Sequence, residues 1–442
     1  MANTVIRPKI CIVRKSLPPS APHSSDITNS NGSSSNGPKP PGLRNVLALG
    51  LVSFFTDFST EMILGILPLY IVNNLGASKA ILGTIEGSAE LINYSMRMVS
   101  GSLSDKIGKR KIFVIIGYGL STASKPFFAA STGWVEAFIV RATDRIGKGV
   151  RTAPRDALIA DSVSETISGK AFGIHRTIDQ LGAILGPIAA FAILQVSDIR
   201  YVFLFSLIPG AVAVFILIYF VKEVAVKRHS STKVTVLSNI GSLVTKRENR
   251  PFVFLLVVSG IFGLGAFNFS FILLKASDLK IEESFIPIIY AVINVAHTAV
   301  GIPAGILADR IGKVKVLIIG YIVFAVSTIL MAILSESPLF AYILALIFGT
   351  YLGIGETVQR AIIPKYVPSE MRGTAYGLYY LVAGVTFFAA NVVFGFLWDA
   401  FTLNIAVLYS IVLSVGAIIG MFVFVKEYSN RSNTSEVNSK EL

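Results

Sequence analysis

Residues 101–110, GSLSDKIGKR, recur in nearly the same form as GILADRIGKV at residues 305–314. The two copies of this decapeptide lie 204 residues apart (101 to 305). A second pair, GKAFG at 169–173 and GTAYG at 373–377, has the same separation. A constant offset between two separate motif pairs indicates that the chain is internally duplicated.

Each decapeptide is flanked by long apolar segments. Apolar residues make up 53% of the chain and charged residues 15%, with a mean hydropathy of +0.68, which excludes an ordinary soluble domain. An apolar run of about 20 residues can cross a bilayer as a helix. We therefore predict an all-α membrane protein with twelve transmembrane helices in two pseudo-symmetric six-helix bundles, an arrangement typical of secondary transporters. The predicted helices are 44–72, 79–104, 111–131, 133–158, 168–195, 199–222, 251–276, 283–308, 315–334, 338–363, 372–396 and 401–425.

These helices divide the chain into two bundles, 44–222 and 251–425, with a cytoplasmic linker at 223–250. Residues 1–43 are rich in Ser, Asn, Pro and Gly, a composition typical of disordered tails, and 426–442 form a second tail. The single cysteine, Cys11, excludes an internal disulfide.

Basic residues follow the second, sixth and eighth predicted helices, and few lie in the alternate loops. The positive-inside rule then places the even-numbered loops and both termini in the cytoplasm, and we expect the plasma membrane as the location. The formal net charge of +13 is explained by this asymmetry. Because the cations are dispersed over membrane loops, we expect no nucleic-acid partner.

The predicted fourth helix is unusually charged for a membrane span. At 100° per residue, six side chains share one stripe: Arg141, Asp144, Arg145, Lys148, Arg151 and Arg155. A charge at the bilayer centre costs about 2.5–3.5 kcal/mol. The stripe is therefore predicted to face the interior of the bundle.

Acidic residues of neighbouring helices are spaced to meet this stripe. We consider two roles for them: proton binding that depends on conformation, or static salt bridges that join the helices. The proton-coupling candidates are Asp57, Glu61, Glu86, Glu90 and Asp179. The candidates for cavity charge or binding of an anionic substrate are Arg97, Arg141, Asp144, Arg145, Lys148, His175 and Arg176, with Asn268, Asn294, Glu356 and Gln359 on the opposite wall.

The decapeptides resemble the loop signature G-x-L-x-D-R-x-G-R-R of the Major Facilitator Superfamily, from which the second copy departs at Val314. The resemblance implies a cytoplasmic gate, with a constitutive loop anchor as the alternative, formed by Gly101, Asp105, Gly108, Arg110, Gly305, Asp309, Arg310 and Gly312. Gly108 and Gly312 also suit the positive φ of a tight loop. Gly182, Gly186 and Pro187 resemble the fifth-helix motif of proton-linked drug and metabolite antiporters, although Ala190 and Phe191 stand where that motif continues with glycines.

The sequence thus predicts a monomeric secondary active transporter that moves a small molecule by alternating access, with proton-coupled efflux as the leading interpretation. An organic-anion importer or exchanger is one alternative. A sensor or scaffold that does not transport is an alternative of another class. We predict no enzyme activity and no cofactor, because the four histidines lack metal-ligand spacing and no nucleophile motif is present.

Overall fold

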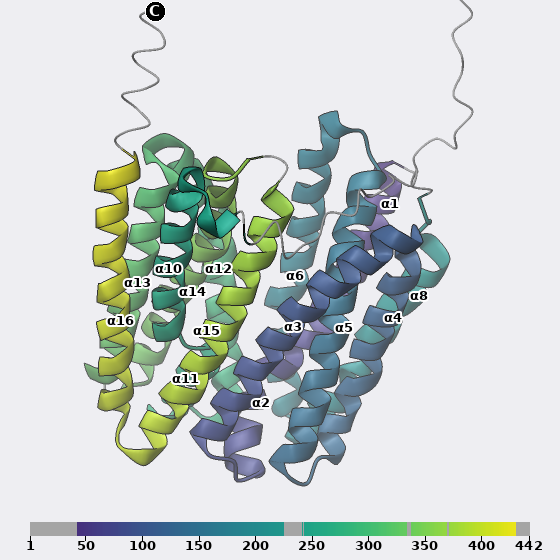
Figure 1. The fold of residues 1–442 in the computed structure, drawn as a ribbon. Coiled ribbons are helices and arrows are strands. Elements are labelled where there is room, and N and C mark those ends of the chain that lie inside the picture. Colours follow the sequence, from purple (N-terminus) through teal and green to yellow (C-terminus); the bar gives the residue numbers. More distant parts are fainter. Residues whose placement is uncertain (1–41, 225–240, 242, 334–336, 369–370, 430–442) are drawn as a thin grey trace, which may run out of the picture. The chain divides into compact units, whose positions relative to one another are not determined.

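The computed structural model describes residues 42–224, 241, 243–333, 337–368 and 371–429. Almost all of the two predicted tails and most of the predicted linker lie outside these residues. Within the described ranges every regular element is a helix, and the helices run roughly alongside one another (Figure 1). The prediction of an all-α fold is confirmed.

Helical elements occur in the same order in the two halves. The first half contains α1 (Leu43–Leu64), α2 (Leu67–Leu69), η1 (Tyr70–Asn74), α3 (Lys79–Ile107), α4 (Arg110–Ser124), η2 (Lys125–Ala130), α5 (Trp134–Asp161), η3 (Glu165–Ile167), α6 (Ser168–Leu194), α7 (Ile199–Phe205) and α8 (Leu207–Phe220). The second contains η4 (Arg247–Asn249), α10 (Arg250–Gly265), α11 (Phe269–Asp278), η5 (Glu283–Phe285), α12 (Ile286–Ile311), α13 (Lys313–Ile333), α14 (Pro338–Ile362), η6 (Ile363–Lys365), α15 (Arg372–Ala400), α16 (Leu403–Phe424) and η8 (Val425–Ser429).

Ten helical segments of the described chain are long and apolar enough to cross a membrane. The helices α3 and α5 are long enough as well, at 29 and 28 residues, but they are too charged to count among the ten. They pack against each other, and α5 also packs against α4 while α3 packs against α15. The predicted total of twelve spans is therefore reached only if α3 and α5 also cross the membrane, with their charges buried against the neighbouring helices.

The helix boundaries repeat with the offset seen in the motifs. The helices α5 and α14 begin at Trp134 and Pro338, and α6 and α15 begin at Ser168 and Arg372. Each pair is separated by 204 residues, as the decapeptides are. The internal duplication thus extends from short motifs to whole helices.

The first helix of each half is interrupted. In the first half, α1 ends before Pro68, which stands in the opening turn of α2. In the second, α10 ends at Gly265, and Asn268 caps α11 by accepting a hydrogen bond from the backbone N–H of Ser270 (2.9 Å). The backbone N–H of Asn268 is in turn bound by the side chain of Asn391 (2.8 Å). Buried partners of this kind allow a break within a membrane helix.

The two halves touch most closely where α3 crosses α15 (Figure 1). Near the start of α3, the carboxylate of Asp399 accepts a hydrogen bond from the backbone N–H of Ala80 (2.7 Å). One turn further on, Gly83 and Gly87 face the backbone of Asn391 and Phe388 so closely that any side chain would collide. Glycine is therefore required for this helix approach.

The loops of the decapeptides lie at the other end of these helices. Gly108 and Gly312 end α3 and α12 with φ values of +71° and +100°, as the sequence predicts. Both values are left-handed, a conformation that glycine adopts without the steric cost of a Cβ atom.

Candidate functional site

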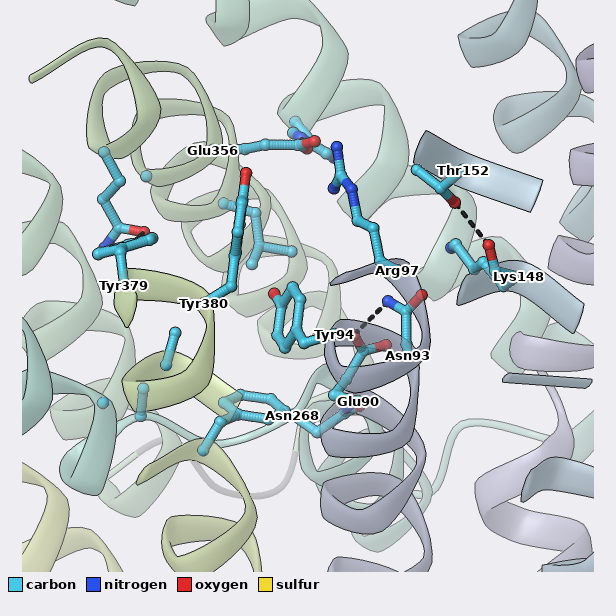
Figure 2. Close-up of a pocket in the computed structure, with 18 of the residues that line it drawn as sticks. Glu90, Asn93, Tyr94, Arg97, Lys148, Thr152, Asn268, Glu356, Tyr379 and Tyr380 are labelled. Carbon is cyan, nitrogen blue, oxygen red and sulfur yellow. Dashed lines mark hydrogen bonds and ion pairs between the residues drawn. The ribbon is translucent and has the colours of Figure 1, made fainter. Parts of the chain in front are cut away.

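A cavity of about 460 Å³ lies between the two halves (Figure 2). On α3 its lining runs from Glu90 to Arg97, and on α5 from Lys148 to Asp156, so it lies at the middle of α3 and in the half of α5 nearer the decapeptide loops. At the opposite end the halves are in contact through Ala80 and Asp399. The cavity is therefore closed on the side away from the decapeptides.

The two walls of the cavity differ in chemistry. The first half supplies charged side chains, which are Asp57, Glu90, Arg97, Lys148, Arg151, Arg155, Asp156, Arg176 and Asp179. The second half supplies mostly aromatic and apolar side chains, among them Phe262, Phe269, Tyr351, Tyr379, Tyr380 and Phe387. Of the lining residues described in the second half, Glu356 is the only carboxylate. One wall thus offers charges and the other offers flat apolar surfaces.

Behind the charged wall lies a fully buried ion-pair layer. Glu86 and Arg141 are 1% and 2% exposed, and Oε2 of Glu86 lies 2.6 Å from Nη2 of Arg141. The carboxylate of Asp144 lies 3.6 Å from Arg141 and 3.9 Å from Arg145, and it accepts a hydrogen bond from Ser121 (2.5 Å). The interior orientation predicted for the fourth-helix stripe is thus seen at these positions.

Glu90 and Asp57 extend this ion-pair layer to the surface of the cavity. Oε1 of Glu90 lies 3.2 Å from Nη1 of Arg145, while Nδ2 of Asn93 donates to its other oxygen (3.2 Å). Asp57 has a looser partner, since its nearest paired cation, Arg151, is 3.9 Å away. The guanidinium of Arg151 also lies over the ring of Tyr118, 4.3 Å from its centroid. Asp57 is therefore the less tightly bound of the two carboxylates.

Glu61 is buried at the boundary between the halves. Its side chain is 9% exposed, and its Oε2 accepts a hydrogen bond from the hydroxyl of Tyr290 on α12 (2.5 Å). Within the described chain no cation lies within 4.0 Å of this carboxylate. Glu61 thus differs from Glu86 and Glu90, whose partners are arginines of the same half.

A second link between the halves involves α6. Arg176 lies 3.3 Å from Asp179 on its own helix and 2.9 Å from Glu356 on α14. Nε2 of His297, on α12, lies 2.7 Å from the same oxygen of Glu356. His175, in contrast, is buried away from the cavity lining and hydrogen-bonds to Ser53 (2.9 Å).

The candidates of the second half have separate positions. Asn268 lines the cavity beside the break between α10 and α11. Gln359 also lines it and accepts a hydrogen bond from the Tyr379 hydroxyl (2.8 Å). Asn294 lies outside the lining and donates to the carbonyl of Ala183 in the other half (2.8 Å). Of these three, only Asn294 joins the halves.

The first decapeptide forms an ion-pair cluster within its own half. Arg110 lies 2.5 Å from Asp161 and 3.4 Å from Asp105. The carboxylate of Glu223 accepts the backbone N–H groups of Arg110 (3.1 Å) and Lys111 (2.9 Å). In the second decapeptide Asp309 and Arg310 are exposed, and neither has an ion pair among the residues that the structure describes. The described contacts therefore join elements of one half and do not bridge the two.

The small residues of both motif sets pack between helices. Gly101 faces Ala153, and Gly305 faces Thr357. Gly182 and Gly186 face the backbone of α1 near Phe54 and Phe58, with Pro187 inside α6. These fifth-helix residues let α6 approach α1 closely.

Sequence reasoning missed one buried cation. Lys125, at the start of η2, is 1% exposed and donates to the hydroxyls of Ser59 (3.1 Å) and Thr60 (2.7 Å) on α1. The available signal was a lysine inside the apolar run 111–131, where an ionisable residue marks a functional position by default. Arg155 and Asp156, an ion pair at 2.8 Å on the cavity surface, were likewise not among the site candidates.

Two duplicated helical halves around a polar cavity define the architecture of a secondary membrane transporter. The family model of the Major Facilitator Superfamily matches residues 49–295 and 253–442. The chain therefore belongs to the Major Facilitator Superfamily and is a membrane transporter.

Relatives in archaea cover nearly the whole chain. An MFS-type transporter of Methanocaldococcus jannaschii, MJ1317, is 35% identical over 381 residues, which span 84% of this chain and 92% of the relative. A second one from the same organism, MJ1560, is 27% identical and covers 87% of this chain and 98% of its own.

Solved transporters share the fold at low identity. The nucleoside transporter NupG superposes with a TM-score of 0.68 at 15% identity, covering 86% of this chain and 98% of its own. A peptide transporter of the POT type, solved in complex with sulfate, gives a TM-score of 0.69 at 14% identity and covers 87% and 94%. At these identities the likeness extends to the fold and not to the substrate.

Proposed function

We propose that this transporter couples substrate movement to protons, and that Glu61, with Asp57 beside it in the cavity, binds the proton. The observation that carries this proposal is the Glu61 carboxyl group, which is buried with no described cation within 4.0 Å and is bound by Tyr290 of the other half. A carboxylate in low dielectric without a counter-ion favours its neutral, protonated form. A static structural role is better served by an arginine partner, as at Glu86.

Alternating access gives this hydrogen bond a role in coupling. Because Glu61 and Tyr290 belong to different halves, rocking of one half against the other would lengthen or break their bond. The carboxyl group would then exchange a protein partner for water, which changes its affinity for a proton. Proton binding and conformation would thus be linked through a single pair of side chains.

Whether the proton and the substrate compete or bind together depends on the charge of the substrate. A cationic substrate competes with the proton for the carboxylates, as proton-driven efflux requires, whereas an anionic substrate binds better once a carboxylate is neutralised. In the described interior, eight basic side chains face eight carboxylates: Arg97, Lys125, Arg141, Arg145, Lys148, Arg151, Arg155 and Arg176, and Asp57, Glu61, Glu86, Glu90, Asp144, Asp156, Asp179 and Glu356. One bound proton leaves an excess of one positive charge. This balance favours the organic-anion importer over the efflux of a cationic compound.

We further propose that the decapeptide loops face the cytoplasm of the plasma membrane, as the positive-inside rule indicates. In that orientation the cavity, which approaches the decapeptide end, is turned toward the cytoplasm. The described conformation would then be the inward-facing member of the transport cycle.

The test uses purified protein in liposomes with the permanently charged probes benzenesulfonate and benzyltrimethylammonium, which do not cross the bilayer as neutral acids or bases. For Glu61→Gln we expect probe uptake driven by a pH gradient to fall at least about tenfold, while gradient-free exchange stays within about threefold. Tyr290→Phe is the companion variant: it removes the hydrogen bond that links proton binding to conformation but leaves the carboxyl group, so gradient-driven uptake should fall by less than in Glu61→Gln. Equal loss of both activities in Glu61→Gln would contradict proton binding at this residue.

A further inference from the structure

We infer that the cavity binds an aromatic organic anion, with the acid group at Lys148 and Arg151 and the ring against the tyrosine-rich wall of the second half. This inference rests on the proposed function in one respect, namely that the cavity is the transport site. It adds two distinct subsites on opposite walls and the class of substrate that fits both.

Among the described residues, Lys148 is the one basic residue of the cavity lining without an ion pair. Four other basic residues of the lining lie within 4.0 Å of a carboxylate: Arg97, Arg151, Arg155 and Arg176. Among the residues described, the ammonium group of Lys148 has neither an ion pair nor a side-chain hydrogen bond. Figure 2 shows it on α5 beside Thr152, whose hydroxyl binds the Lys148 carbonyl and not the ammonium group (2.6 Å).

Arg151 lies one helical turn beyond Lys148, and part of its guanidinium group has no hydrogen-bond acceptor. Its side chain is 3% exposed, and Nε and Nη1 are buried without a hydrogen-bond partner in the described chain. Its link to Asp57 is long, at 3.9 Å. Buried donors without partners are costly, and a bound carboxylate, sulfonate or phosphate supplies the acceptors they lack. The two neighbouring cations therefore form an anion subsite.

Most carboxylates of the cavity are, in contrast, already engaged. Glu90 is held by Arg145 and Asn93, Asp156 by Arg97 and Arg155, and Glu356 by Arg176 and His297. Asp179 is paired with Arg176 at 3.3 Å, and Asp57 alone has only a long contact, 3.9 Å from Arg151. A cationic substrate would have to displace a close partner at every cavity carboxylate except Asp57. An anion at Lys148 displaces none and can also use the unpaired donors of Arg151, so this conformation favours negative ligands.

The opposite wall is built of aromatic rings, several of which stack on one another. Tyr380 of α15 stacks on Tyr94 of α3 with ring centroids 5.4 Å apart, and the guanidinium of Arg97 lies 5.3 Å from the Tyr380 centroid (Figure 2). Phe262, Phe269 and Phe387 continue this wall. Aromatic faces and edges bind planar ligands in offset or edge-to-face arrangements. The volume of about 460 Å³ is enough for a molecule of one or two rings.

The test is equilibrium binding by calorimetry to the full chain in lipid nanodiscs, with no gradient, using four matched probes. Benzenesulfonate carries the ring and the charge, methanesulfonate only the charge, benzenesulfonamide only the ring, and benzyltrimethylammonium the ring with the opposite charge. We expect benzenesulfonate to bind at least about tenfold more tightly than each of the others, since each lacks or reverses one subsite contact.

Variants locate the two subsites. Lys148→Gln should weaken benzenesulfonate binding about tenfold and leave benzenesulfonamide unchanged, and Tyr380→Leu should weaken both ring probes. Lys148→Arg should retain binding within about threefold, and Lys170→Gln, an exposed lysine outside the cavity, should bind as wild type. Because no described carboxylate lies within 4.0 Å of Lys148, its neutral variant breaks no close ion pair, and the melting temperature of Lys148→Gln should stay close to that of the wild type.

Tighter binding of the cationic probe, or unchanged benzenesulfonate binding in a folded Lys148→Gln, would overturn the inference. These outcomes are independent of proton coupling, because no gradient is applied. Binding as expected with no gradient dependence at Glu61 would refute only the proposed coupling, and gradient-driven movement of the cation would refute only the substrate class.

Discussion

The helices α5 and α14 occupy the same place in the two halves of the molecule, and yet their inward faces have opposite characters. Both are long helices whose first residues are separated by the 204-residue offset. Five charged residues of α5, which are Arg141, Asp144, Arg145, Lys148 and Arg151, correspond to Ala345, Phe348, Gly349, Leu352 and Gly355 of α14. The two halves therefore share the helical scaffold, while the buried charges of this helix pair are concentrated in the first half.

The inward faces of α5 and α14 each pack against residues of matching chemistry. Arg141 and Arg145 meet carboxylates of α3, whereas Phe348 lies among rings, with centroids 5.8 Å from Phe267 and 5.6 Å from Tyr351. Tyr290 stands 204 residues after Glu86, so the second half lacks the acid that Arg141 requires. The charges of α5 are therefore supported by partners that α14 does not have.

The largest effect is expected where a buried pair loses one member. Arg141→Gln leaves Glu86, 1% exposed, without its cation, and should destabilise the folded protein by about 3–5 kcal/mol. The measurement is the yield of monodisperse protein and its thermal unfolding in detergent. The double variant with Glu86→Gln should recover a large part of the loss. A single variant as stable as the wild type would show that the polar half does not depend on its pairing.

A slightly smaller effect is expected from carrying a charge into the aromatic half. Phe348→Asp places a carboxylate at the position that corresponds to Asp144. The arginines that pair with Asp144 correspond to Ala345 and Gly349 there, so the new carboxylate has no such partner on α14. Replacing an apolar side chain by a carboxylate in the membrane interior should cost about 3 kcal/mol. Phe348→Leu is the control and should cost about 1 kcal/mol in the same unfolding assay. Equal stability of the two variants would mean that α14 accepts a lone charge.

The smallest effect is expected at the decapeptides. Arg110 corresponds to Val314, and Asp161 corresponds to Lys365, so only the first half has this ion pair. Arg110→Val should cost about 1 kcal/mol, the upper end for exposed pairs, because the two side chains keep only 12% and 27% of their surface in contact with water. The loss should shrink at high salt in thermal unfolding. A loss that persists at high salt would indicate that Arg110 acts by packing and not by charge.

The helix order and the interior position of the charged stripe were predictable from the sequence, for one physical reason. Lipid excludes unpaired charge, so long apolar runs mark the spans and the α5 stripe must turn inward. The observed boundaries, such as Trp134–Asp161 for the predicted 133–158, lie within a few residues of the expected ones.

The pairing within the site could not be predicted in the same way. Helical spacing fixes which residues share a face, but not how one helix is rotated or shifted against another. For this reason the sequence gives no basis for matching Arg141 with Glu86 and Arg145 with Glu90. The bond between Glu61 and Tyr290 joins residues 229 positions apart and depends on how the halves meet. Lys125 was overlooked because it lies where α4 gives way to a 3-10 turn within an apolar run.

The glycine contacts between α3 and α15 have a consequence for how the halves can move. At Gly83 and Gly87 the two main chains meet with no side chain between them. At these two positions α3 has no rotamer to reset, so a pivot of one half centred there would disturb fewer interdigitated side chains than one centred at the Tyr94–Tyr380 stack. The α3–α15 crossing would then be the point about which the halves rotate. A methyl group added at Gly83 would collide with the main chain of Asn391 and hinder that rotation.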